Sequence, residues 1–147
     1  MYERILVATD GSPLSDKAVA NALSLAKLCG ASLVALKVVP RYPRSYLEGG
    51  VTVDNAEIKR IEAQWAEQAQ AMLDKVKAEG KAVGVTVKTS IAKSDLVAEA
   101  IMSAATKQKA DLIVMASHGR KGLKRLLLGS ETQQVLTHSA VPVLVLR

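Results

Sequence analysis

The chain of 147 residues contains no phenylalanine, one tryptophan and three tyrosines. Aliphatic side chains must therefore build the hydrophobic core, and the aromatic platforms on which single-stranded nucleic acids stack are scarce. There is one cysteine, Cys29, and there are two histidines, His118 and His138. These counts exclude an internal disulfide and a CxxC zinc site, and they disfavour a His/Cys metal centre.

Long apolar stretches are also missing. No run approaches the roughly 18–20 residues of a membrane-spanning helix, and the N-terminal segment lacks the long apolar stretch of a signal peptide. A cytoplasmic protein without membrane contact is therefore expected. The length is typical of one domain, residues 1–147, and a composition of 49% hydrophobic and 23% charged residues excludes a disordered chain.

Short runs of valine, leucine and isoleucine alternate along the chain with segments of helical periodicity. The runs predict five strands, at residues 5–8, 33–39, 83–91, 111–116 and 141–146. Because apolar residues are nearly continuous within them, both faces of each strand are expected to be buried, as in a parallel sheet. Right-handed crossovers then predict an α/β fold: a doubly wound five-stranded parallel sheet with helices on both faces.

The helices between these strands carry their own signals. Ser15 is a plausible N-cap of the first helix, and Gly30 follows its last turn. Asp54 opens a long second helix, on whose apolar stripe Trp65 is interpreted as a core anchor. Ser94 is expected to cap the third helix.

Ligands of doubly wound sheets bind beyond the carboxyl ends of the strands, where the strand order reverses. This rule selects residues 9–12 and 117–125. Asp10 is an acid suited to accept hydrogen bonds from ribose hydroxyls, although Asp-Gly-Ser-Pro also fits an Asx-turn. Gly129-Ser130 begins the last helix, whose free N–H groups form an anion site, although Ser130 with Gln133 also fits a capping box.

Positive charge is concentrated at this end of the chain. The net charge is +6, and residues 112–147 carry five basic residues and one acidic residue. Within one six-residue stretch lie Arg120, Lys121, Lys124 and Arg125. A small cluster of positive charge suits a phosphate ligand better than a long polynucleotide. The alternative interpretation is a solvent-exposed basic loop that binds nothing.

Together these features resemble the universal stress protein family over essentially the whole chain. The resemblance is carried by ILVATDGSPLSDKAVANAL, MASHGRKGLKRLLLGSETQQVL and VPVLVLR. In the nucleotide-binding branch the family motif is Gly, two residues, Gly, nine residues, Gly, then Ser or Thr. Gly119, Gly129 and Ser130 match it, whereas Ala116 replaces the first glycine. The added methyl group is expected to alter affinity, or preference among ATP, ADP and AMP.

The resemblance implies roles for individual residues at an adenine-nucleotide site. Thr9 and Asp10 would contact the nucleoside, Val38 would offer its backbone to adenine, and Met115 would pack against the base. The phosphates, with or without Mg²⁺ or Mn²⁺, would be held by Gly119, Gly129, Ser130 and Thr132. Arg120 is added to these predicted nucleotide-binding residues because of its charge alone. Ala116, at the position of the first motif glycine, is also included among them.

Glu131 follows the motif serine directly. Pointing inward, its carboxylate would repel the phosphates unless a divalent cation intervened. Pointing outward, it would favour the helix dipole. Both orientations are consistent with the sequence.

The resemblance also implies a homodimer that pairs the last strand, residues 141–146, which is too apolar for an exposed edge. Pro142 would sit where the ladder requires no donor. The leading interpretation is a homodimeric adenine-nucleotide-binding regulator of stress adaptation that signals through residues 40–53 or through the dimer.

Three alternatives accompany this interpretation. The first is slow ATP hydrolysis or autophosphorylation, with Ser117, Ser130 or Thr132 as acceptor, although no activated nucleophile and no Walker lysine are evident. The second is a dimeric scaffold that binds partners and no nucleotide, which the replacement at Ala116 keeps open. The third, nucleic-acid binding through the basic loop, ranks last.

Overall fold

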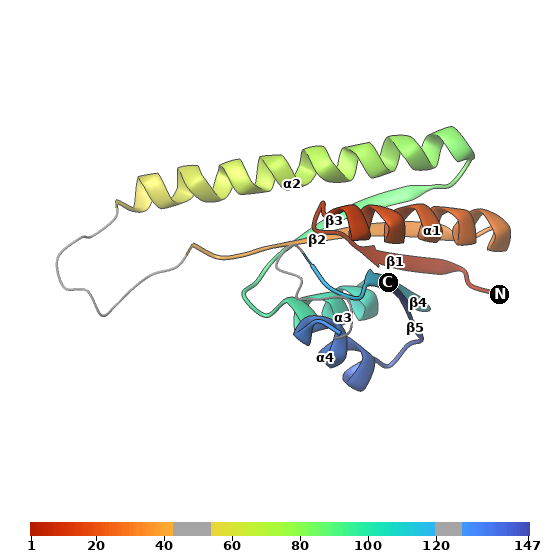
Figure 1. Ribbon diagram of the computed structural model, residues 1–147. Helices are drawn as coiled ribbons and strands as arrows, with labels where there is room; N and C mark the ends of the chain where they lie inside the picture. Colours follow the sequence, from red (N-terminus) through yellow and green to blue (C-terminus); the bar gives the residue numbers. More distant parts are fainter. Residues whose placement is uncertain (43–53, 120–127) are drawn as a thin grey trace.

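The computed structural model describes residues 1–42, 54–119 and 128–147. Strands and helices alternate along the chain (Figure 1) as β1 (Arg4–Ala8), α1 (Pro13–Cys29), β2 (Ser32–Val39), α2 (Asn55–Val83), β3 (Val87–Lys93), α3 (Val97–Lys107), β4 (Leu112–Ala116), α4 (Ser130–His138) and β5 (Val143–Leu146). All strand pairs are parallel, in the order β3-β2-β1-β4-β5. The predicted α/β fold with a five-stranded parallel sheet is confirmed.

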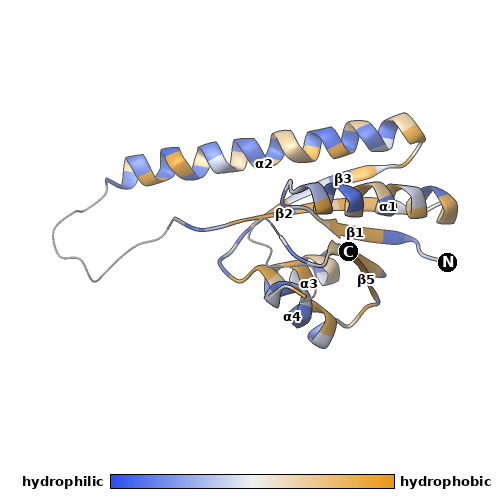
Figure 2. Ribbon diagram, viewed as in Figure 1, coloured by the Kyte–Doolittle hydropathy of each residue, from blue (hydrophilic) through white to orange (hydrophobic). Residues whose placement is uncertain are grey.

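Two helices cover each face of the sheet. Ile5 and Val7 of β1 belong to a buried cluster with residues of α1 and α2, whereas Leu6 between them belongs to a second cluster with α3 and α4. This division follows from the two-residue period of a strand, which sends successive side chains to opposite faces. In Figure 2 most of β1 and β2 is accordingly apolar, whereas polar and apolar residues alternate along α2.

The first helix begins earlier than predicted. Its N-cap is Ser12, whose hydroxyl accepts a hydrogen bond from the N–H of Ser15 at 3.2 Å. The assignment of the N-cap to Ser15 is therefore wrong. Pro13 occupies the start of the helix, where its fixed φ is favourable and its missing N–H is not needed. Ser15 is buried in the first turn and donates its hydroxyl proton to the carbonyl of Ser12.

The second helix continues through the start of the predicted third strand. It ends at Val83, followed by Gly84 in the left-handed conformation (φ 80°), and β3 begins only at Val87. The strand predicted at 83–91 is therefore displaced. A Cβ at buried Gly80 would collide with the side chain of Val87, so glycine lets the last turns of α2 lie close to β3.

Two other boundaries differ from the prediction. The N-cap of α3 is Leu96, not Ser94; the Ser94 hydroxyl accepts a hydrogen bond from the Leu96 N–H in the preceding turn. The last strand begins at Val143 instead of residue 141. Pro142 precedes it and contributes only its carbonyl, which accepts from the N–H of Ile113 at 3.0 Å.

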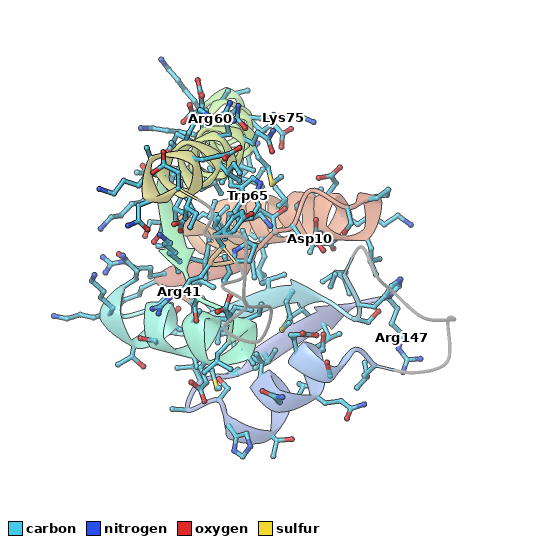
Figure 3. The ribbon with its side chains drawn as sticks, turned by 90° about the vertical axis from the view of Figure 1, so that its left-hand side faces the viewer. Asp10, Arg41, Arg60, Trp65, Lys75 and Arg147 are labelled. Atoms are coloured by element: carbon cyan, nitrogen blue, oxygen red, sulfur yellow. The ribbon has the colours of Figure 1, made fainter. Side chains whose placement is uncertain are left out.

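Trp65 is not a core anchor. It is half-buried outside both core clusters and stacks on Tyr42, with ring centroids 6.2 Å apart (Figure 3). The reason is the length of α2, whose N-terminal half extends past the ends of the strands (Figure 1). Trp65 therefore covers the chain segment that leaves β2.

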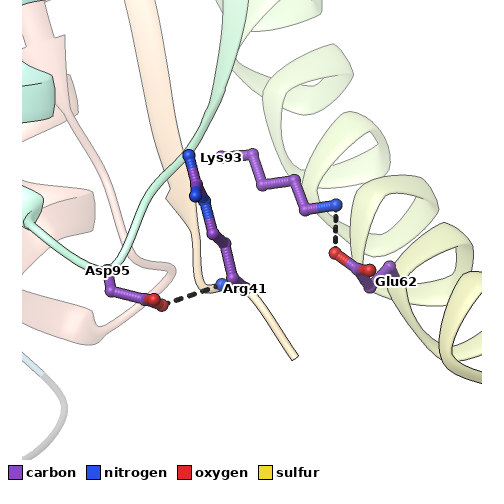
Figure 4. Close-up of polar contacts among 4 residues, drawn as sticks. All are labelled: Arg41, Glu62, Lys93 and Asp95. Atoms are coloured by element: carbon purple, nitrogen blue, oxygen red, sulfur yellow. Dashed lines mark hydrogen bonds and ion pairs between the residues drawn. The ribbon is translucent and has the colours of Figure 1, made fainter. Parts of the chain in front are cut away.

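Two polar contacts lie near the same segment, and one of them holds it (Figure 4). The N–H of Arg41 donates to the Asp95 carboxylate at 3.0 Å, which ties the end of β2 to the turn before α3. An ion pair between Lys93 and Glu62 joins the end of β3 to α2. The exit of β2 is thus fixed in position. Among the described residues, no helix is long and apolar enough to cross a membrane.

Candidate ligand-binding cleft

A cleft of about 570 Å³ opens at the carboxyl ends of β1, β2 and β4. From β1 the chain adds β2 and then β3 toward one edge of the sheet. It then returns to add β4 and β5 toward the other edge, so the strand order reverses between β1 and β4. This is the position at which doubly wound sheets bind ligands. The volume lies within the range of about 300–1,000 Å³ typical of small-molecule sites.

The structure brings the predicted site residues together. Along the wall of this one cleft lie Thr9, Asp10, Val38, Met115, Ala116, Gly119, Gly129, Ser130 and Thr132. Arg120 and the other three residues of the basic cluster lie outside the described residues. The placement is a property of the fold, and the binding role of each residue stays a prediction.

The turn after β1 is held rigidly by its own side chains. Thr9 is buried, its N–H donates to the carbonyl of Leu36 at 2.9 Å, and its hydroxyl accepts from the N–H of Gly11 at 3.2 Å. Asp10 lies at the entry to α1 (Figure 3), where its Oδ1 accepts from the N–H of Ser12 at 2.9 Å. The Asx-turn is therefore present. It fixes the carboxylate at the mouth of the cleft.

The other oxygen of this carboxylate faces the glycine turn after β4. A Cβ added to Gly119 would lie 2.7 Å from Oδ2 of Asp10, closer than real Cβ contacts. The φ angle of Gly119 is not positive, so the close approach to Asp10, and not an unusual backbone conformation, favours glycine here. The two segments selected from the sequence are thereby in contact.

A set of hydrogen bonds joins the end of β4 to the start of α4. The N–H of Gly129 donates to the carbonyl of Ser117 at 2.8 Å. The buried hydroxyl of Thr132 lies 3.0 Å from the carbonyl of Ala116 and 3.2 Å from that of Ser117. The Thr132 side chain therefore holds the start of the turn after β4 against the first turn of α4. Beside it, the Ser117 hydroxyl lies 3.2 Å from Nδ1 of His118.

The N-terminus of α4 opens into the cleft without a side-chain cap. Its N-cap is Gly129, in extended conformation, and the capping box between Ser130 and Gln133 is not formed. Instead the Gln133 amide donates to the carbonyl of Leu128 at 3.0 Å. The first N–H groups of a helix have no partners within it and carry the positive end of the helix dipole. This end of the cleft therefore favours an anion.

The opposite wall is apolar and was partly missed by the sequence reasoning. Beside Val38 and Met115 it contains Leu36, Val97 and Ile101. From the sequence, Val97 and Ile101 of α3 are ordinary core positions. Their helical spacing does not indicate that this face of α3 reaches the cleft. Lys37 also lines the cleft. It interrupts the apolar run of β2, and that interruption was the available signal.

The arrangement suits binding of a molecule that is flat and apolar at one end and anionic at the other. Within residues 1–42, 54–119 and 128–147 there is no group of three or more His, Cys, Asp or Glu side chains that could hold a metal ion. A Cβ at Gly129 would lie 3.3 Å from the Ser117 carbonyl oxygen, so glycine lets the start of α4 lie close to the turn after β4.

Fold and cleft together define a doubly wound α/β protein with a cleft at its topological switch point. The chain belongs to the universal stress protein family, whose model matches residues 1–147. Universal stress protein MJ0531 of Methanocaldococcus jannaschii is 36% identical, with 100% of this chain and 83% of that protein covered.

Solved structures of the same family share the fold. UspA from Lactobacillus plantarum superposes with a TM-score of 0.84 at 25% identity, covering 99% of this chain and 98% of that one. A universal stress protein in complex with cAMP superposes with a TM-score of 0.72 at 26% identity, covering 99% and 97% of the two chains.

Proposed function

We propose that this protein binds an adenine nucleotide in the cleft and acts as a regulator in the cytoplasmic stress response, without turning the nucleotide over. The observation that carries the proposal is the combination, in one cleft, of an apolar wall with the open N-terminus of α4. A nucleotide has the matching chemistry, since a flat base is joined through a sugar to an anion. The related structure in complex with cAMP supports the choice of adenine.

The proposed pose follows the chemistry of the walls. The base lies against Val38, Ile101 and Met115, and the ribose hydroxyls donate to the Asp10 carboxylate. The phosphates lie at the first turn of α4, beside Gly129. ATP or ADP would bring Mg²⁺ or Mn²⁺ with its phosphates, and Glu131 is the lining carboxylate suited to contact that ion.

Thermal unfolding tests the proposal. AMP, ADP or ATP at about a hundred times its dissociation constant is expected to stabilise the protein by roughly 2.7 kcal/mol, a shift of several degrees for a domain of this size. GTP at the same concentration is expected to give no shift. Nucleotide already bound is detected by acid extraction and chromatography. If no adenine nucleotide shifts unfolding and none is extracted, the protein is better described as a partner-binding scaffold.

We also propose that the functional unit is a homodimer joined along β5. Only alternate residues of β5 and its flanks bond to β4 through the backbone. The carbonyls of Pro142 and Leu146, for example, accept from the N–H groups of Ile113 and Ser117. The N–H and C=O groups of Val143 and Val145 therefore point away from the sheet. Leu144 is 40% exposed on this edge strand, and an apolar edge of this kind invites pairing.

Replacing Val145 by proline is expected to yield a monomer, because proline removes an outward N–H while β4 keeps its hydrogen bonds. Light scattering coupled to size exclusion measures the mass. Val145→Ala is the control, since it shortens the side chain but keeps the N–H, and it should stay dimeric. A dimeric Val145→Pro protein, folded by circular dichroism, would rule out pairing through this edge.

A further inference from the structure

A negative charge lies at the end of the cleft that is expected to hold phosphate. Glu131 is in the first turn of α4, lines the cleft and is exposed. Its Oε2 accepts the hydroxyl proton of Ser130 at 3.0 Å. A serine hydroxyl has a single proton, so while it donates to Glu131 it cannot donate to a ligand.

We infer that Glu131 makes the cleft select nucleotides by phosphate charge, favouring monophosphates, including cyclic ones, over triphosphates when no divalent cation is present. The inference rests on the proposed adenine-nucleotide function and specifies its ligand class.

The charges of the described lining residues support this selection. They comprise two carboxylates, Asp10 and Glu131, and one ammonium group, that of Lys37. Each additional phosphate brings more negative charge toward Glu131, and the repulsion grows with that charge. The helix dipole favours one anionic group within its first turn, and this attraction does not extend to a second or third phosphate farther along.

Glu131→Gln tests the inference because it removes the charge and keeps the size and shape of the side chain. Calorimetric titration with AMP and with ATP, in EDTA at low ionic strength, gives the ratio of the two affinities. Wild type is expected to bind AMP more tightly than ATP. Glu131→Gln is expected to bind ATP about tenfold more tightly than wild type, with AMP changed less than about threefold.

Glu99→Gln is the matched control. Glu99 also lies in the first turn of a helix, α3, and is exposed, but it does not line the cleft. Its replacement should leave the ratio at the wild-type value. High salt, which screens exposed charges, should reduce the difference between wild type and Glu131→Gln, whereas a purely steric effect would persist.

Each outcome has a distinct meaning. An unchanged ratio in Glu131→Gln, with both nucleotides bound, overturns the role of Glu131 and leaves the adenine site intact. An equal change in Glu99→Gln would assign the effect to net charge and overturn the inference as well. Binding of neither nucleotide to any of the three proteins would overturn the proposed function itself.

Discussion

Replacement of Gly119 by alanine is expected to weaken AMP binding about 100-fold while leaving the protein folded. The new Cβ would lie 2.7 Å from Oδ2 of Asp10, so the carboxylate must move away from the position at which we propose that it accepts the ribose hydroxyls. A hydrogen bond to a charged group contributes about 1.5–3 kcal/mol, which corresponds to this loss. Calorimetric titration measures the affinity, and circular dichroism confirms the fold.

A double-mutant cycle provides the control for this result. In an Asp10→Ala protein the carboxylate is absent, so the methyl group of Gly119→Ala has no oxygen to displace, and the second substitution should add little further loss. A similar loss from Gly119→Ala in both backgrounds would mean that the methyl group obstructs the ligand directly. Wild-type affinity in the single variant would contradict the proposed site.

The largest expected loss of stability follows replacement of Ile113 by alanine. Ile113 is fully buried in the interior strand β4, between β1 and β5, and belongs to the core beneath α3 and α4. Removing three carbons there leaves a cavity, and such replacements lower the free energy of unfolding by about 2–5 kcal/mol. That is a large part of the roughly 5–15 kcal/mol that a domain has. Urea unfolding measures the difference.

Ile91→Ala is the same chemical change at an exposed position of the edge strand β3, where the side chain is 36% accessible. It should lower the free energy of unfolding by less than about 1 kcal/mol, because part of the isoleucine surface already faces water. Equal losses in the two variants would show that strand propensity, and not burial, determines the effect.

The fold could be predicted because its signals are local and repeated. Aliphatic runs in β1, β2 and β4, separated by helical periods, specify a parallel sheet without reference to any distant residue. The boundary between α2 and β3 could not be predicted in the same way. The segment from Val83 onward has the composition of a strand, yet Val83 is the last residue of α2, Gly84 turns the chain, and β3 begins only at Val87, where Gly80 lets the last turns of α2 lie close to the strand. That contact exists only in the folded protein.

The same distinction applies to the cleft. Gly119, Gly129 and Asp10 carry signals of turn chemistry that can be read from the sequence. Val97 and Ile101 carry none, because they reach the cleft only through the position of α3 in the assembled fold. Trp65 illustrates the opposite error, since its place on an apolar stripe suggested burial in the core, whereas the side chain is half-buried and stacks on Tyr42.

The stacking of Trp65 on Tyr42 has a spectroscopic consequence. Trp65 is the only tryptophan of the chain, so the tryptophan emission of the protein originates from a single indole. That indole rests on the segment leaving β2, the strand that contributes Val38 to the cleft wall. The protein therefore carries a native optical probe at the exit of β2. Events at the end of β2 can be followed in solution without attaching a dye.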